Sequence, residues 1–257
     1  MLRNVIRFFH RALTLLTALV LASAALYAGF ALWDNSQIYT AAESSFDEMR
    51  AIWDQREARE DMGDSFADLV KINEDVTAWI TVPGTAIDYP VLRGRTNMTY
   101  INKDVYGKFS LSGSIFLDSR NDRDYADGYS LLYGHNMSQH RMFADVNLFK
   151  DKTFFDTHTG AMLYLPDRGI MLTSLSVLVT PDTNAYIFNP ENWTGLEPDK
   201  ILEIIKTDAM YISEENMGRF ERMLKEGRRP QIVCLSTCSS EFTNARTALI
   251  TFADPEV

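Results

Sequence analysis

The stretch Gln231 to Asp254, QIVCLSTCSSEFTNARTALITFAD, sets the pattern around which the chain is organised. An apolar, β-rich run ends at Cys238, a polar segment follows, and a second apolar run, opened by Arg246, extends to Phe252. This order predicts a strand, a loop and a second strand. If the two strands are antiparallel neighbours, the thiol and the guanidinium lie at the same end of one sheet. Because nearby positive charge favours a thiolate, Cys238 is a candidate nucleophile.

A candidate base lies upstream, in the segment GYSLLYGHNM at residues 128–137, where a β-rich run leads to His135. The other histidines fit this role less well, because His10 precedes an apolar segment and His140 and His158 lie among polar residues. His135 alone follows a strand that can aim its side chain, so it is the predicted acid/base. No HExxH or CxxC spacing is present, which argues against a metal site.

Three separate motifs resemble those of class B sortases of Gram-positive bacteria: Leu235-Ser236-Thr237-Cys238, Tyr133-Gly134-His135 and Asn244-Ala245-Arg246. The resemblance covers residues 76–252. It implies a mostly β fold with added helices, of the α+β class, built on a closed barrel of about eight strands. It also implies a membrane-anchored cysteine transpeptidase with Cys238 as nucleophile, His135 as acid/base and Arg246 as the residue that stabilises an oxyanion.

The resemblance further implies a peptide groove. The matching positions are Asn97, Ile101, Tyr133, Tyr186, Ile187 and Ser236. Each of these residues could instead be ordinary packing. Many class B members carry Glu directly after the cysteine, whereas this chain has Ser239, whose backbone N–H we expect to be available as an oxyanion donor.

The implied reaction cleaves a C-terminal sorting signal of exported proteins through a thioacyl-enzyme. The acyl group then passes to an amine of a cell-wall precursor or of a pilin lysine, without a cofactor. One alternative is a sortase-fold protein that binds signal peptides and catalyses little. The other is a hydrolytic thiol protease, although the papain-like C-G-S-C-W and caspase-like Q-A-C-R-G contexts are absent.

The N-terminal segment predicts a membrane anchor. Residues 1–11 are basic and amphipathic, and Ala12 to Trp33 is 22 residues without a charge, about 33 Å as a helix. The basic flank predicts a single-pass protein of the plasma membrane, with a cytoplasmic N-terminus and an extracellular catalytic domain. A cleaved signal peptide is the alternative, because Ala22-Ser23-Ala24 resembles a cleavage site. We favour the retained anchor, since a signal core is usually ~7–15 residues long.

Charge and cysteine usage narrow the class of protein. The chain has a net charge of −10 and only three arginines in its first 33 residues, so residues 34–257 carry −13. Such an acidic domain has no electrostatic footprint for nucleic acid. Cys234 and Cys238 on one strand would have Cα atoms about 13 Å apart. A disulfide needs less than about 7 Å, so we expect both thiols to be free.

Apolar periodicity divides the rest of the chain into a helical region at residues 34–75 and a catalytic domain at 76–257. We expect the first to pack on the second. Strands are predicted at 78–82, 87–92, 114–117, 130–133, 160–165 and 170–180, and the proline at position 90 indicates an edge strand. Helices are predicted at 142–149, 199–207 and 214–225. The last two lie in a long connection, 182–229, which the resemblance identifies as typical of class B.

Overall fold

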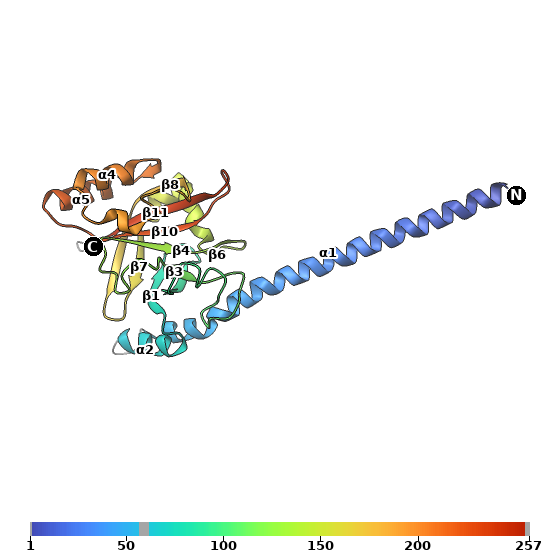
Figure 1. The fold of residues 1–257 in the computed structure, drawn as a ribbon, viewed down its shortest axis with the longest axis horizontal. Helices are drawn as coiled ribbons and strands as arrows, with labels where there is room; N and C mark the ends of the chain where they lie inside the picture. The colour runs from blue at the N-terminus through green and yellow to red at the C-terminus, as the bar shows by residue number, and fades with distance from the viewer. Residues whose placement is uncertain (1, 57–61, 255–257) are drawn as a thin grey trace.

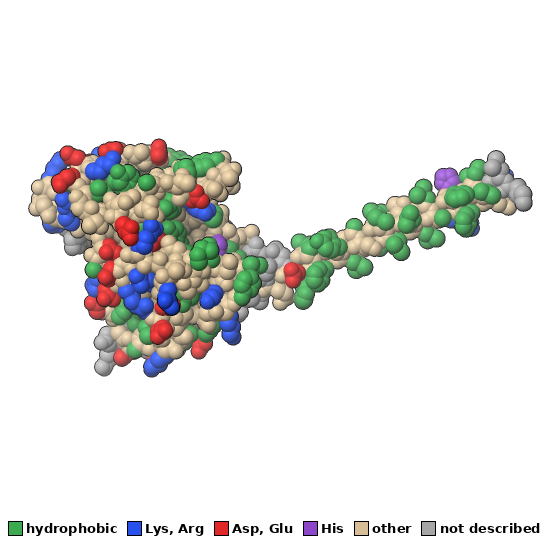
Figure 2. Space-filling model, viewed as in Figure 1, with side chains coloured by type: hydrophobic (Ala, Val, Ile, Leu, Met, Phe, Trp, Pro, Cys, Tyr) green, Lys and Arg blue, Asp and Glu red, His purple; other side chains and the backbone are tan. Residues whose placement is uncertain are grey.

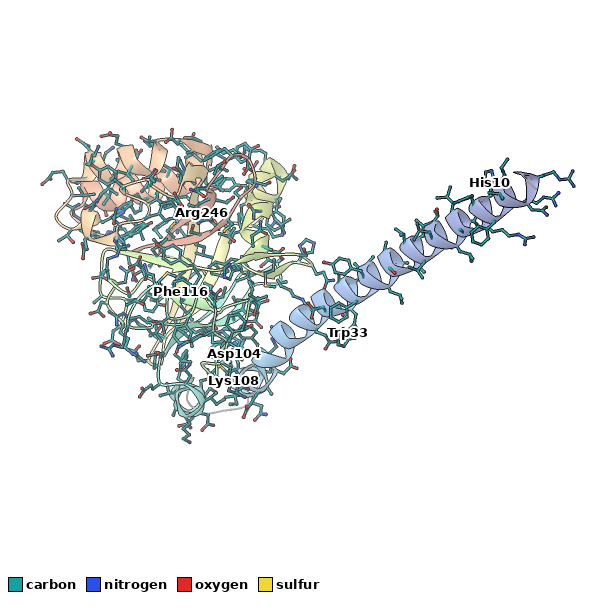
Figure 3. All side chains as sticks on the ribbon, turned by 45° about the vertical axis from the view of Figure 1, so that its right-hand side comes forward. His10, Trp33, Asp104, Lys108, Phe116 and Arg246 are labelled. Atoms are coloured by element: carbon teal, nitrogen blue, oxygen red, sulfur yellow. The ribbon has the colours of Figure 1, made fainter. Side chains whose placement is uncertain are left out.

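The computed structural model describes residues 2–56 and 62–254 and begins with one unbroken helix, α1 (Leu2–Asp54). Figure 1 shows α1 projecting far from the other elements, and Figure 3 labels His10 and Trp33 along it. Its segment Arg3–Asp34 is long and apolar enough to cross a membrane, and no part of that segment's apolar window is buried within the protein. Figure 2 shows hydrophobic side chains around this projecting part and charged side chains over the domain.

The last turns of α1 belong to the domain. Phe46, Met49 and Trp53 are almost fully buried, and the Trp53 ring stacks on Trp79 with centroids 4.8 Å apart. The second helix, α2 (Met62–Ile72), adds further buried side chains to the same core. Burial of a large apolar side chain stabilises a fold by roughly 1.5–3 kcal/mol. The end of the long helix is therefore integral to the core.

Eight strands close into a barrel, in the order β11-β10-β4-β3-β2-β1-β7-β8 and back to β11. Their bounds are β1 (Val76–Thr81), β2 (Asp88–Leu92), β3 (Ile115–Leu117), β4 (Tyr129–Tyr133), β7 (Gly160–Tyr164), β8 (Gly169–Pro181), β10 (Ile232–Cys238) and β11 (Ala245–Ala253). Strand pairs are antiparallel except β10–β4 and β2–β3, which are parallel. The predicted barrel of about eight strands with added helices is confirmed.

The predicted edge position of Pro90 is wrong. β2 pairs with β1 on one side, where Pro90 lies opposite Trp79, and with β3 on the other. The β3 pairing begins only at Val91, one residue after the proline. A proline lacks an N–H and so cannot donate to a ladder. β3 is short and pairs with β2 only after the proline, so the missing N–H does not interrupt that pairing. An interior strand can therefore contain a proline.

The connection before the cysteine strand is helical, as predicted. It contains the short 3-10 helix η3 (Pro190–Trp193), α4 (Pro198–Lys206), the strand β9 (Ala209–Ile212) and α5 (Glu214–Lys225). The apolar faces of α4 and α5 pack on the outside of the barrel in a second core, where Phe220 meets Phe252 at 5.3 Å between ring centroids. Figure 1 shows both helices beside β8 and β11. The sequence did not predict β9, which pairs with β8 at residues 176–178, after the part of β8 that pairs with β7.

A small hairpin, β5 (Asn136–Met137) and β6 (Arg141–Met142), follows the predicted base. The 3-10 helix η2 (Ala144–Lys150) and the helix α3 (Lys152–Thr157) come next. The helix predicted at 142–149 is therefore the tighter 3-10 type and starts two residues later. These elements return the chain to the end of the barrel at which β10 finishes, because side chains of η2 contact the loop after Cys238.

Candidate active site

The parallel pairing of β4 and β10 brings His135 and Cys238 to one end of the barrel. Ser236 lies opposite Tyr133, and each strand delivers its functional residue two positions further on. Beyond the ladder, the Gly134 N–H donates to the Ser236 carbonyl at 3.1 Å and the Thr237 hydroxyl donates to the Gly134 carbonyl at 2.9 Å. The backbone leading to the imidazole is therefore bonded directly to the backbone leading to the thiol.

Antiparallel pairing of β10 with β11 places Arg246 directly opposite Cys238. The Arg246 Nη1 lies 2.6 Å from the Cys238 Sγ, and its Nη2 lies 3.8 Å from a carboxyl oxygen of Asp182, the residue that follows β8. Cys238 is half-buried and 30% of the Arg246 side chain is exposed. A guanidinium is permanently charged and has five N–H donors, so donors remain for a substrate.

Two asparagine side chains hold the main chain of Cys238. Its carbonyl accepts from Asn136 Nδ2 at 3.0 Å and from Asn147 Nδ2 at 3.3 Å. The next N–H, that of Ser239, donates to the Ala245 carbonyl at 2.9 Å. The expectation that this N–H is available as an oxyanion donor is therefore wrong, because the loop between β10 and β11 turns tightly enough to use it internally. The peptide plane that follows the nucleophile is fixed at both ends.

The His135 ring is oriented by a carbonyl. Its Nε2 lies 2.7 Å from the Ile101 oxygen. A carbonyl oxygen can only accept, so Nε2 carries a proton and Nδ1 is the nitrogen that can gain or lose one. Among the residues that the structure describes, no hydrogen bond joins His135 to Cys238. The two side chains instead face a common cavity, so a reacting group between them could exchange a proton with the imidazole.

That cavity has a volume of about 250 Å³ and a mostly apolar wall. It is lined by Asn97, Met98, Ile101, Phe116, Tyr133, Gly134, His135, Ser236, Thr237, Cys238 and Arg246. Figure 3 labels two of these side chains, Phe116 and Arg246, in the body of the domain. An apolar cleft with a few convergent polar groups is the usual form of a binding site, and here it surrounds a thiol.

Comparison with known proteins identifies the family. No family model matches the chain. A curated relative from Staphylococcus aureus, named Sortase B, is 36% identical over 192 residues, which cover 73% of each chain. The chain belongs to the sortase B family. It is therefore a sortase-type cysteine transpeptidase.

Two further matches agree with this assignment. A Sortase B from Listeria monocytogenes is 27% identical over 240 residues, 91% of each chain. The solved structure of a Streptococcus pyogenes class B sortase, described as involved in pilus biogenesis, is 34% identical with a TM-score of 0.64. That match covers 74% of this chain and 97% of the other. In these three comparisons the similarity covers 73% to 91% of the chain.

Four of the six residues matched to the sortase B peptide groove line the cavity: Asn97, Ile101, Tyr133 and Ser236. The other two do not. Ile187 is 1% exposed and packs in the outer core, and Tyr186 lies beside it. The hydroxyl oxygen of Ser236 is buried and has no hydrogen-bond partner within the described structure. A buried hydroxyl without a hydrogen-bond partner is unfavourable, and Ser236 belongs to the wall of the cavity.

The sequence did not indicate the polar network behind the cavity. Asp118 is fully buried and accepts from Asn97 at 2.9 Å, from Tyr133 at 3.2 Å and from Arg120 at 2.7 and 2.8 Å. Burial alone would raise the pKa of the Asp118 carboxyl, but the hydrogen bonds from Arg120 and Asn97 lower it below its ordinary value. Burial also raises the pKa of the Tyr133 hydroxyl, which therefore stays protonated and donates.

The remaining thiol and histidines lie elsewhere. Cys234 is fully buried on β10, and burial raises the pKa of its thiol to about 12. His140 is bonded to the buried carboxylate of Asp145 at 2.6 Å, at the end of the β5–β6 hairpin. His158 stacks on the ring of Phe154 at 3.8 Å. None of these side chains lines the cavity around Cys238.

Proposed function

We propose that this enzyme joins proteins to an amine acceptor by cleaving a C-terminal sorting signal through a thioacyl intermediate on Cys238. The observation that carries the proposal is the 2.6 Å contact between Arg246 Nη1 and Cys238 Sγ, inside a cavity that also contains His135. The cation favours a nucleophilic thiolate. The same cation can then stabilise the negative charge that develops on the attacked carbonyl.

In the first half-reaction the thiolate attacks the scissile carbonyl, at a bond similar to Thr–Gly or Thr–Asn in the signal. The C–S bond forms, and the oxyanion receives hydrogen bonds from the Arg246 guanidinium. When the tetrahedral intermediate collapses, the C–N bond breaks and the leaving amine takes a proton from His135 Nδ1. Nε2 remains bonded to the Ile101 carbonyl throughout, which keeps the ring oriented.

In the second half-reaction an amine attacks the thioester carbonyl. A C–N bond forms, the C–S bond breaks to release Cys238 as the thiolate, and His135 Nδ1 takes up the proton that the amine loses. The acceptor is the amine of a cell-wall precursor or a pilin lysine. Water in its place would give hydrolysis. The half-buried position of Cys238 and the apolar wall of the cavity favour the amine by limiting water at the thioester.

The signal peptide is held by the cavity wall. Ser236 and Asn97 contribute polar side chains to this wall, and Ile101 and Tyr133 contribute apolar surface. Tyr186 and Ile187 support this wall from its outer side, because the segment that contains them packs against the outer core and does not line the cavity. These four wall residues come from separate parts of the chain, so the groove depends on the complete barrel.

We further propose that α1 is a retained single-pass anchor of the plasma membrane, with the N-terminus in the cytoplasm and the domain from residue 76 outside. The helix continues from Asp34 to Asp54 without a break, about 30 Å at 1.5 Å per residue. Arg3, Arg7 and Arg11 precede the apolar segment, which favours a cytoplasmic N-terminus. Anchoring places the enzyme where exported proteins and lipid-linked acceptors emerge.

The test uses the full chain in detergent micelles, mixed with a library of sorting-signal peptides and either triglycine or a lysine-containing pilin-type peptide. Intact mass reports the acyl adduct on the protein, and product mass reports which amine was used. We expect an adduct in the wild type and in Cys234→Ala, none in Cys238→Ala, and an amide-linked product. A folded protein whose Cys238 reacts with an alkylating agent, yet forms no adduct with any peptide, would contradict the proposal and favour a binding protein.

A further inference from the structure

The buried carboxylate of Asp118 is shared between the cavity and a surface loop. On one side it holds Asn97 and Tyr133, two residues of the cavity wall. On the other side it receives two hydrogen bonds from Arg120, whose guanidinium extends away from the cavity. Since 31% of the Arg120 side chain is exposed and Asp118 is fully buried, the arginine connects the interior to the surface.

The outer end of Arg120 binds the segment between β8 and η3, residues 182–189, which we call the groove loop. Arg120 Nη2 donates to the Phe188 carbonyl at 2.7 Å, and Nη1 donates to the Asn189 side-chain oxygen at 2.6 Å. A single planar guanidinium thus bonds to Asp118 and to two residues of the loop. Lysine could not reproduce this arrangement, because an ammonium is a point charge without a planar fork.

Aromatic rings also connect the groove loop to the barrel. Tyr133 stacks on Phe116 at 5.2 Å and on Phe188 of the groove loop at 6.4 Å, so the ring lies between the barrel and the loop. The next carbonyl back along the loop, that of Ile187, accepts from the buried Tyr129 hydroxyl at 2.8 Å. Arg120 therefore joins the groove loop to Asp118, the carboxylate that orients Asn97 and Tyr133 in the cavity wall.

We propose that Asp118 and Arg120 form a latch that docks the groove loop on the barrel and thereby sets the shape of the peptide groove. Both are positioning residues, since neither lines the cavity around Cys238. The proposal rests on the proposed function, because a peptide must occupy this groove. If the loop is released, Tyr133 loses its contact with Phe188 and the Arg120 guanidinium is no longer held at its outer end. Asn97 and Tyr133, which share Asp118 with Arg120, are then less well ordered when the peptide arrives. Peptide binding then weakens, while the thiol and its arginine are unaffected.

The test variant is Arg120→Lys in the full chain, which keeps a cation near the buried carboxylate. The matched control is Arg123→Lys, a nearby arginine that bonds to the Glu74 and Val76 carbonyls away from the cavity. A second variant, Asn189→Ala, removes one loop partner without touching Asp118. We expect Arg120→Lys to raise KM for the signal peptide about tenfold, ~1.4 kcal/mol. Asn189→Ala should raise it about threefold, by the loss of one charge-assisted hydrogen bond.

Three readouts separate a latch from general destabilisation. In both test variants kcat at saturating peptide and the alkylation rate of Cys238 should stay within twofold of the wild type, and amide hydrogen exchange over residues 182–193 should become faster. The Arg123→Lys control should change none of these. An unchanged KM with unchanged exchange would overturn the latch, as would kcat, alkylation and KM worsening together.

Hydrogen exchange over residues 182–193 also distinguishes failure of the latch from failure of the proposed reaction. If the wild type forms no adduct with any peptide, the proposed reaction fails. Faster exchange over residues 182–193 in Arg120→Lys would still support the docking of the loop. If the wild type is acylated but exchange and KM do not respond to either variant, the latch fails and the reaction stands.

Discussion

Replacing Arg246 with Met tests the central contact of the site. The substitution keeps a long apolar stem and removes the guanidinium whose Nη1 lies 2.6 Å from Cys238 Sγ. An arginine at the start of a surface strand is more often a solvated residue without a chemical role. The two interpretations predict very different kinetics, because a guanidinium in contact with the sulfur also lies near the oxygen of the attacked carbonyl, where the negative charge develops.

The magnitude follows from the position of the donor. An oxyanion donor acts at 2.7–3.1 Å from the charged oxygen, and loss of one such donor lowers kcat by about 10²–10³, or ~2.7–4 kcal/mol. The Arg246 side chain is 30% exposed, so we expect the lower end, about 10². Arg246→Lys keeps the charge but loses the fork, and we expect a decrease of about tenfold.

The assay compares kcat/KM for signal-peptide cleavage with the rate of Cys238 alkylation in each variant. Both should fall in Arg246→Met, since the cation acts on the thiolate as well as on the transition state. The control is Arg168→Met, which removes an arginine on the β7–β8 turn that is 47% exposed and paired with Asp167. It should leave both quantities unchanged. If Arg246→Met retains kcat/KM within threefold of the wild type at equal thermal stability, the reasoning is refuted.

Other predictions concern the neighbours of the site. Cys234→Ala should leave acylation unchanged, and the buried thiol of the wild type, with its pKa raised to about 12 by burial, should resist alkylation of the folded protein in intact-mass measurements. Gly134→Ala should lower the free energy of unfolding by about 1–3 kcal/mol and reduce activity, since the added Cβ would lie 2.6 Å from Phe143 Cγ; urea unfolding checks this. The pKa of Glu241 is lowered to about 2 by Lys150, so its stabilising contribution is present above its ordinary value near 4.5 and is lost as the pH falls toward 2. Glu241→Gln should lose less stability than the wild type as the pH falls from 4.5 toward 2, which acid unfolding measures. A Glu241 carboxyl that titrates near 4.5 in the folded wild type would contradict the pairing of Glu241 with Lys150.

Local patterns in the sequence predicted the elements that carry the chemistry. Cys238, His135 and Arg246 were each found at the end or the start of an apolar run, and the helices at 199–207 and 214–225 from their buried stripes. These inferences succeed because the period of apolar residues reports burial along one segment, and burial sets where each segment begins and ends. The proline in β2 was misjudged for the same reason, since a single segment does not show how long its neighbour is.

Only the tertiary structure determined which residues from distant segments meet. Nothing near Asn136 or Asn147 in the sequence indicates that their amides bind the carbonyl of Cys238, and nothing near Asp118 indicates that Arg120 connects it to Phe188. Such partners are brought together by the closure of the barrel through β8 and β11 and by the return of η2 to the end of β10. A hydrogen bond depends on the position of two groups in space, whereas hydrophobic periodicity specifies only which face of a segment is buried.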